Sequence, residues 1–158
     1  KLIIFIRRYN MAKVGRAAYA ASRARLEVVT ADKTISKNES GELYAIDAGG
    51  ALAITLPADA ESGTRYSFWI IDDVTGGAVT ITSGAATAPF QGAITFDDDD
   101  AAGDTDQIKA DGVATDDDVL TLAADTEQGS WIDCVYDADN TRWLVCGFVS
   151  AATAPTFS

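Results

Sequence analysis

A chain of 158 residues, 47% of them hydrophobic, is long enough for one domain with its own core and too apolar to be disordered throughout. It contains no histidine, which excludes a Ser/His/Asp or Cys/His nucleophile and removes the commonest general base and metal ligand, so we expect no enzyme activity. The net charge of −12 is uneven: the first 25 residues hold seven basic and no acidic side chains, whereas residues 26–158 hold five basic and 24 acidic ones, a balance of −19. Such an acidic body repels phosphates, so no nucleic acid partner is expected.

Residues 1–10 precede the first methionine, Met11, and are interpreted as a translated leader. Arg7 and Arg8 can be encoded by AGGAGG, the consensus bacterial ribosome-binding sequence, and the next two codons supply the spacer before Met11. The apolar run at the start is too short to span a bilayer, and its basic residues follow it, unlike those of a secretory signal, so no membrane partner is expected. We hypothesise that the true start is Met11, which an intact native mass that includes Lys1 would disprove.

Residues 11–27 form a basic arm that is rich in alanine, with arginine at intervals. Helix propensity is fair apart from Gly15, but no apolar stripe runs along one side. We therefore expect an extended or partly helical segment that orders on a partner.

From about residue 26 the pattern changes to short apolar strands between turns that contain Gly, Asp or Pro. Strands are expected over residues 26–30, 43–47, 52–56, 66–71, 78–82, 106–110 and 119–122, followed by a hairpin of residues 130–136 and 142–148. About eight to ten short strands at this spacing predict an all-β domain over residues 28–158, an antiparallel β-sandwich or barrel of jelly-roll-like form.

The last hairpin is apolar on both sides, so both sides are expected to be covered. One face is expected to carry Ile132, Cys134 and Tyr136 with Leu144, Cys146 and Phe148. The opposite face, a candidate subunit interface or part of the core, is expected to carry Trp131, Val135, Trp143 and Val145. Cys134 and Cys146 are interpreted as small buried side chains in neighbouring strands, with a cross-strand disulfide as the alternative.

Two further groups of side chains suggest binding chemistry. A calcium site is predicted at the acidic run and its neighbours, Asp97, Asp98, Asp99, Asp100, Asp104 and Asp106, although the spacing is not that of an EF-hand and a solvated acidic loop is the alternative. A sugar-binding platform could be formed by the aromatic residues Tyr66, Phe68, Trp69, Trp131, Tyr136, Trp143 and Phe148, but their apolar strands favour packing in the core. No other cofactor is expected.

Five segments of the chain carry recognisable short patterns. They are residues 29–36, 39–47, the "I-T-L-P" of residues 54–57, the "G-x-x-Y-x-F" of residues 63–68, and the closing hairpin of residues 139–147. Together these segments resemble structural proteins of tailed bacteriophages. Asn140 stands in that hairpin where glycine is usual. The resemblance covers roughly residues 28–148 and is shared by capsid decoration (cement) proteins, head fibres and parts of tail fibres. It implies a virion β-sandwich, often trimeric, with no catalytic residues.

The uneven charge then favours a capsid decoration protein on the outer surface of the virion. The basic residues of the arm, Lys13, Arg16, Arg23 and Arg25, would contact an acidic shell made of the major capsid protein, while the acidic body faces solvent. A homotrimer would match the local threefold positions of an icosahedral shell.

Two alternatives belong to other functional classes. A tail-fibre or receptor-binding module predicts exposed aromatic residues and binding to host cells. A secreted bacterial calcium-binding structural protein predicts a real signal peptide and a melting temperature that shifts with calcium.

Overall fold

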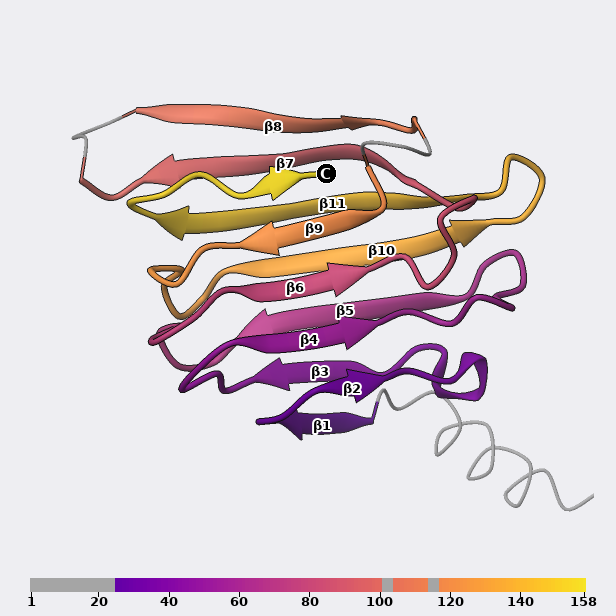
Figure 1. Cartoon of the computed structure of the whole chain (residues 1–158), viewed down its shortest axis with the longest axis horizontal. Helices are drawn as coiled ribbons and strands as arrows, with labels where there is room; N and C mark the ends of the chain where they lie inside the picture. The colour runs from indigo at the N-terminus through magenta and orange to yellow at the C-terminus, as the bar shows by residue number, and fades with distance from the viewer. Residues whose placement is uncertain (1–24, 101–103, 114–116) are drawn as a thin grey trace, which may run out of the picture.

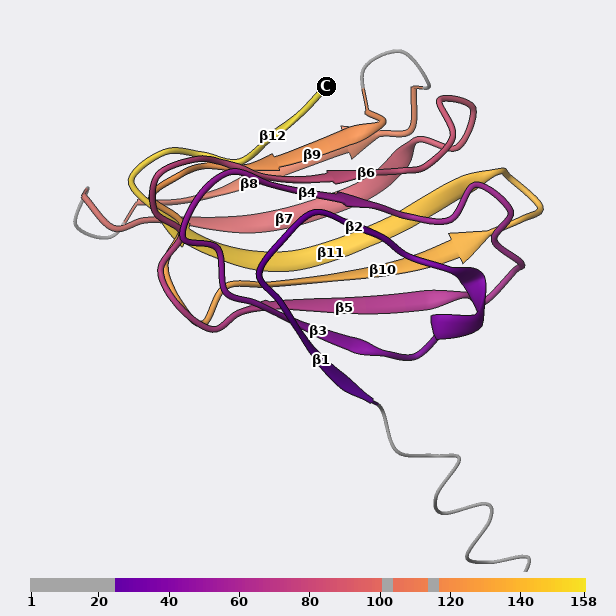
Figure 2. The same ribbon diagram turned by 60° about the horizontal axis from the view of Figure 1, so that its bottom comes forward.

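A computed structural model describes residues 25–100, 104–113 and 117–158, and these residues form two β-sheets packed face to face (Figures 1 and 2). Within them the one helical element is a turn of 3-10 helix, η1 (Lys37–Glu39), so the prediction of an all-β sandwich is confirmed. The predicted leader lies outside the described residues, as do Lys13, Arg16 and Arg23 of the arm.

The larger sheet has seven strands, in the order β1-β3-β5-β10-β11-β7-β8. From one edge to the other these are β1 (Leu26–Val29), β3 (Leu43–Ile46), β5 (Arg65–Ile70), β10 (Trp131–Asp137), β11 (Arg142–Ala151), β7 (Phe90–Asp98) and β8 (Thr105–Asp111).

The smaller sheet has five strands and covers one face of the larger one (Figure 2). In spatial order these are β12 (Thr156–Phe157), β9 (Val119–Leu122), β6 (Val79–Thr82), β4 (Leu52–Thr55) and β2 (Lys33–Thr34).

Both sheets are mixed, which corrects the expectation of purely antiparallel pairing. Up to β6 the chain crosses to the other sheet after every strand and returns in the same direction, so β1–β3, β3–β5, β2–β4 and β4–β6 are parallel. β11 and β7 are also parallel, whereas the other five pairs, including the β7–β8 and β10–β11 hairpins, are antiparallel. A turn is visible in a sequence, but whether it reverses the chain within one sheet or carries it to the opposite sheet is not.

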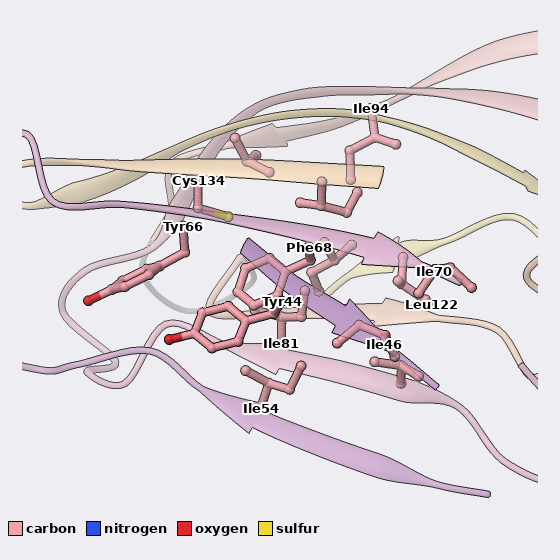
Figure 3. Close-up of a cluster of buried hydrophobic side chains, with 14 of the residues drawn as sticks. Tyr44, Ile46, Ile54, Tyr66, Phe68, Ile70, Ile81, Ile94, Leu122 and Cys134 are labelled. Carbon is pink, nitrogen blue, oxygen red and sulfur yellow. The ribbon is translucent and has the colours of Figure 1, made fainter. Parts of the chain in front are cut away.

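The core lies between the sheets, where alternate side chains of each strand point inward (Figure 3). Tyr66 and Trp143 pack with their ring centroids 5.9 Å apart. Their polar ends are satisfied by backbone carbonyls: the Tyr66 hydroxyl donates to Ser36 at 3.0 Å, and the Trp143 indole N–H donates to Ser83 at 3.1 Å. The largest fully buried side chains are Trp143, Tyr44, Tyr66, Phe68 and Phe90.

The β10–β11 hairpin differs from the predicted grouping of its side chains. The connection over residues 138–141 sets a register in which each odd-numbered residue of β10 lies opposite an even-numbered residue of β11. Two members of the set predicted as subunit interface or core, Trp143 and Val145, therefore point into the core and are buried. The other two, Trp131 and Val135, lie on the opposite face of the sheet, so the set does not form one surface.

The same register separates the two cysteines. Cys134 lies opposite Val145 and is buried, whereas Cys146 lies opposite Asp133 and is exposed. Both thiols are free and lie on opposite faces of the sheet, so no disulfide joins them and the predicted burial holds for Cys134 alone. Burial raises the pKa of the Cys134 thiol, which keeps it protonated and inert.

Candidate functional site

Exposed apolar side chains gather on the outer face of the seven-stranded sheet, the face turned away from the smaller sheet. Seven large hydrophobic residues are exposed in the described chain, and five of them lie on this face: Leu26, Val28, Trp69, Val135 and Leu144. Large apolar side chains that are exposed together on one face of a protein favour an interaction site there. The outer face is therefore the candidate functional site.

Strand register places five side chains of this face in one row across the sheet. Val28 lies beside Ala45, Ala45 beside Trp69, Trp69 beside Trp131, and Trp131 beside Phe148. The rings of Trp69 and Trp131 are nearly parallel, with an interplanar angle of 24° and centroids 6.5 Å apart. We call Trp69, Trp131 and Phe148 the aromatic ridge; it crosses β5, β10 and β11.

A groove of about 570 Å³ lies beside the aromatic ridge. Its lining includes Leu43, Arg65, Ser67, Trp69, Trp131 and Asp133. Leu43, Ser67 and Asp133 form the row next to the ridge, two residues along each strand and so about 6.8 Å away. Among the described residues no ion pair involves Arg65 or Asp133, so a cation and a carboxylate of the groove are available to a ligand.

β1 forms one edge of the outer face, and it is the strand that the basic arm joins. β3 pairs with one side of β1, and no described strand pairs with the other side. Arg25, the one predicted contact residue of the arm that the structure describes, lies directly before β1. Its side chain is 83% exposed, and its Nη1 lies 3.1 Å from Oε1 of Glu42. The predicted contact residue Arg25 therefore lies at the joint between arm and body.

Three carboxylates, those of Glu27, Glu39 and Glu42, bring one oxygen each within 4.8 Å of one another. Lys33 Nζ already bonds two of them, Glu27 at 2.9 Å and Glu39 at 3.1 Å. Burial lowers the pKa of Lys33, but these hydrogen bonds and charges outweigh burial and raise that pKa overall. With Arg25 on Glu42, the cluster is held by internal cations, and we assign no metal to it.

The aspartates predicted as calcium ligands lie around the β7–β8 hairpin. Asp97 and Asp98 end β7, Asp99 and Asp100 follow it, and Asp104 and Asp106 lie at the start of β8. In the described part of the chain their carboxylates do not meet as a group of three ligand atoms, and residues 101–103, which separate the two groups of aspartates, lie outside it. Burial and the carboxylate of Glu127 raise the pKa of Asp99. Calcium binding stays a prediction without a preformed ligand set.

Asp117 has a structural role that sequence analysis missed. It is buried, and its Oδ2 accepts the backbone N–H groups of Asp111, Gly112 and Val113 at 2.9, 2.9 and 3.2 Å. These bonds tie Asp117 to the last residue of β8 and to the two residues that follow it. The Asp-Gly turn signals the bend, but nothing in one sequence distinguishes Asp117 from its acidic neighbour Asp118.

Comparison with known proteins finds no protein-family model that matches the chain and no curated protein similar to it. In the part of the chain that the structure describes, no helix has the length and apolarity needed to cross a bilayer. The function has to be argued from the surface of the molecule itself.

Proposed function

We propose that this chain is a structural, non-enzymatic protein that decorates the outer surface of an icosahedral phage capsid, with the major capsid protein as its partner. One observation carries the proposal: the basic arm joins the acidic body at β1, an edge strand whose outward side chains are exposed and apolar.

The two edges of the larger sheet differ in a way that makes β1 suited to contact. An open edge presents unpaired N–H and C=O groups to which a partner can add, and proteins usually protect it with charges. The edge strand β8 carries such charges at Asp106, Lys109 and Asp111. β1 instead exposes Leu26 and Val28, at 65% and 54%.

The charge distribution supports a fixed orientation on the shell. Residues 26–158 carry a balance of −19, whereas the first 25 residues carry seven positive charges. Because the arm is positively charged and the body negatively charged, an acidic shell would attract the arm and repel the body. The body would then face solvent and keep virions apart. A homotrimer would place its arms on neighbouring capsomers and gain affinity from simultaneous contacts.

Cosedimentation of the full chain with undecorated capsids tests the proposal. Val28→Ser removes one exposed apolar side chain from β1, and Val113→Ser is the matched control, because that valine is 45% exposed in the β8–β9 connection. We expect V28S to bind about tenfold more weakly than wild type, from the lost burial of one valine side chain, and V113S to bind like wild type. Absence of saturable binding by the wild-type chain, or equal weakening in both variants, would contradict the proposal.

The aromatic ridge favours a second candidate, a tail-fibre or receptor-binding module. Core packing was expected for all the aromatic residues of the strands, and it holds for Tyr66, Phe68 and Trp143. Trp69 is instead 44% exposed, and Trp131 lies beside it on the outer face. This candidate predicts binding to host cells and none to capsids, so the same sedimentation experiment separates the two.

A further inference from the structure

We propose that the groove beside the aromatic ridge binds a neutral saccharide. The inference goes beyond capsid decoration, since such a groove serves a decoration protein and a fibre module equally. It rests on the two kinds of wall that meet in the groove, one aromatic and one polar.

The aromatic wall suits the apolar face of a sugar ring. That face consists of C–H groups with a partial positive charge, which matches the negative face of an indole. Trp69 and Trp131 stand side by side with nearly parallel rings, and Phe148 follows in the same row. Trp69 and Trp131 line the groove, so its aromatic wall extends over β5 and β10, and Phe148 continues the ridge beyond the groove.

The polar wall suits the hydroxyl groups of the same ligand. Each sugar hydroxyl both donates and accepts hydrogen bonds. Asp133 supplies carboxylate acceptors, Arg65 a fork of N–H donors, and Ser67 a hydroxyl that does both. Charged partners of this kind make the stronger hydrogen bonds, and adjacent hydroxyls can be bound in pairs.

The charges of Arg65 and Asp133, which form no ion pair among the described residues, favour a saccharide over a second copy of this chain as the ligand of the groove. An apolar protein surface over the groove would bury Arg65 and Asp133 without partners, which costs free energy. A polyhydroxylated ligand replaces their water with hydrogen bonds. The balance of −19 over residues 26–158 repels acidic polysaccharides, so the ligand is expected to be neutral.

Calorimetric titration of the full chain with neutral oligosaccharides of glucose, mannose and galactose tests the inference, with polygalacturonate as the anionic probe. Saturable binding to at least one neutral probe is expected. Trp131→Ala and Asp133→Ala should each weaken it by about tenfold or more, whereas Trp131→Phe should stay within a few-fold of wild type because it keeps an aromatic face. Val113→Ser is the control and should bind like wild type. Unfolding curves of each variant establish that it is folded.

Three outcomes would overturn the inference: no binding to any neutral probe, binding that W131A and D133A leave unchanged, or preference for polygalacturonate. Light scattering adds a fourth, since a trimer that W131A converts to monomers would make the ridge a subunit interface. Failure of the saccharide site is distinguishable from failure of capsid decoration. V28S is expected to weaken capsid binding alone, and W131A to weaken saccharide binding alone.

Discussion

Several of the aspartates that make this chain acidic also bind its own backbone. Asp117 accepts three backbone N–H groups. Asp137 accepts the backbone N–H groups of Asp139 and Asn140, and the Asn140 side chain donates to it at 2.7 Å. Asn140 thus has a structural role in the hairpin. One sequence shows that such residues are acidic but not which backbone groups they reach.

Replacing Asp117 should destabilise the fold more than replacing its neighbour. Asp117→Ala removes the side-chain acceptor of the Asp111 and Gly112 backbone N–H groups, whereas the Val113 N–H keeps Asp111 Oδ1 at 3.0 Å. We expect the free energy of unfolding to fall by about 2–3 kcal/mol. Asp118→Ala changes the charge equally but removes none of these bonds, so a change below about 0.5 kcal/mol is expected. Urea denaturation of both variants measures the difference. Equal losses would show that net charge, rather than the backbone contacts, sets the effect.

The β10–β11 connection should weaken in acid because of Asp137. Hydrogen bonds from Asn140 and Asp139, with the charge of Arg142, hold the pKa of Asp137 below its ordinary value of 3.8. A group whose pKa is lowered by folding stabilises the fold above its unfolded pKa, and this contribution is lost as the pH falls from about 3.8 through the folded pKa.

NMR titration of the Asp137 carboxyl carbon checks this directly. The midpoint should lie below 3.8 in the wild-type chain and rise toward that value in Asn140→Ala, which removes the side-chain donor. The same midpoint in both proteins would show that the Asn140 amide does not act on Asp137.

At the scale of strands, most positions could be predicted, but the long strand β7 (Phe90–Asp98) and the pairing of the strands could not. Strands expected over residues 43–47, 52–56 and 119–122 correspond closely to β3, β4 and β9. β2, at Lys33–Thr34, is not among the expected strands, because two residues carry no periodicity and its extended form depends on pairing with β4. The helical turn η1, which begins with a capping box of Ser36 and Glu39, was not predicted either. Whether two strands pair in parallel depends on which sheet each connection leads to. No local sequence pattern encodes this choice of sheet.

Gly92 in β7 makes the parallel β7–β11 pair possible. Its φ is 150°, and a Cβ there would overlap the carbonyl oxygen of Val145 on β11. Gly92→Ala should therefore lower the free energy of unfolding by about 3 kcal/mol or more. Gly50→Ala, in a turn with open space around the added carbon, is the control and should be nearly neutral. Thermal and urea unfolding measure both, and a neutral G92A would mean that the two strands can separate without cost.

At the scale of the whole molecule, the acidic body and the basic arm could be predicted, but the functional surface could not. Both faces of the last hairpin are apolar in sequence, so only the register shows that Val135 and Leu144 are outward and Trp143 and Val145 inward. The outer face collects these outward residues with those of β1 and β5, strands distant in the sequence. Such a surface exists only once the chain has crossed between its sheets several times.

The proposed role makes the orientation of the whole molecule predictable. With the arm and the β1 edge on the shell, the opposite edge, β8, and the acidic β7–β8 hairpin lie farthest from it (Figure 1). The surface presented to solvent is then the negatively charged part of the chain, which keeps neighbouring virions apart.

Electron cryomicroscopy of undecorated capsids incubated with the full chain tests the capsid-decoration claim most directly. We expect added density at a fixed set of symmetry-related positions, in groups of three chains at local threefold axes, with the β1 edge nearest the shell and β8 farthest away. Capsids without added density, or density in which another edge or face of the sandwich meets the shell, would contradict it.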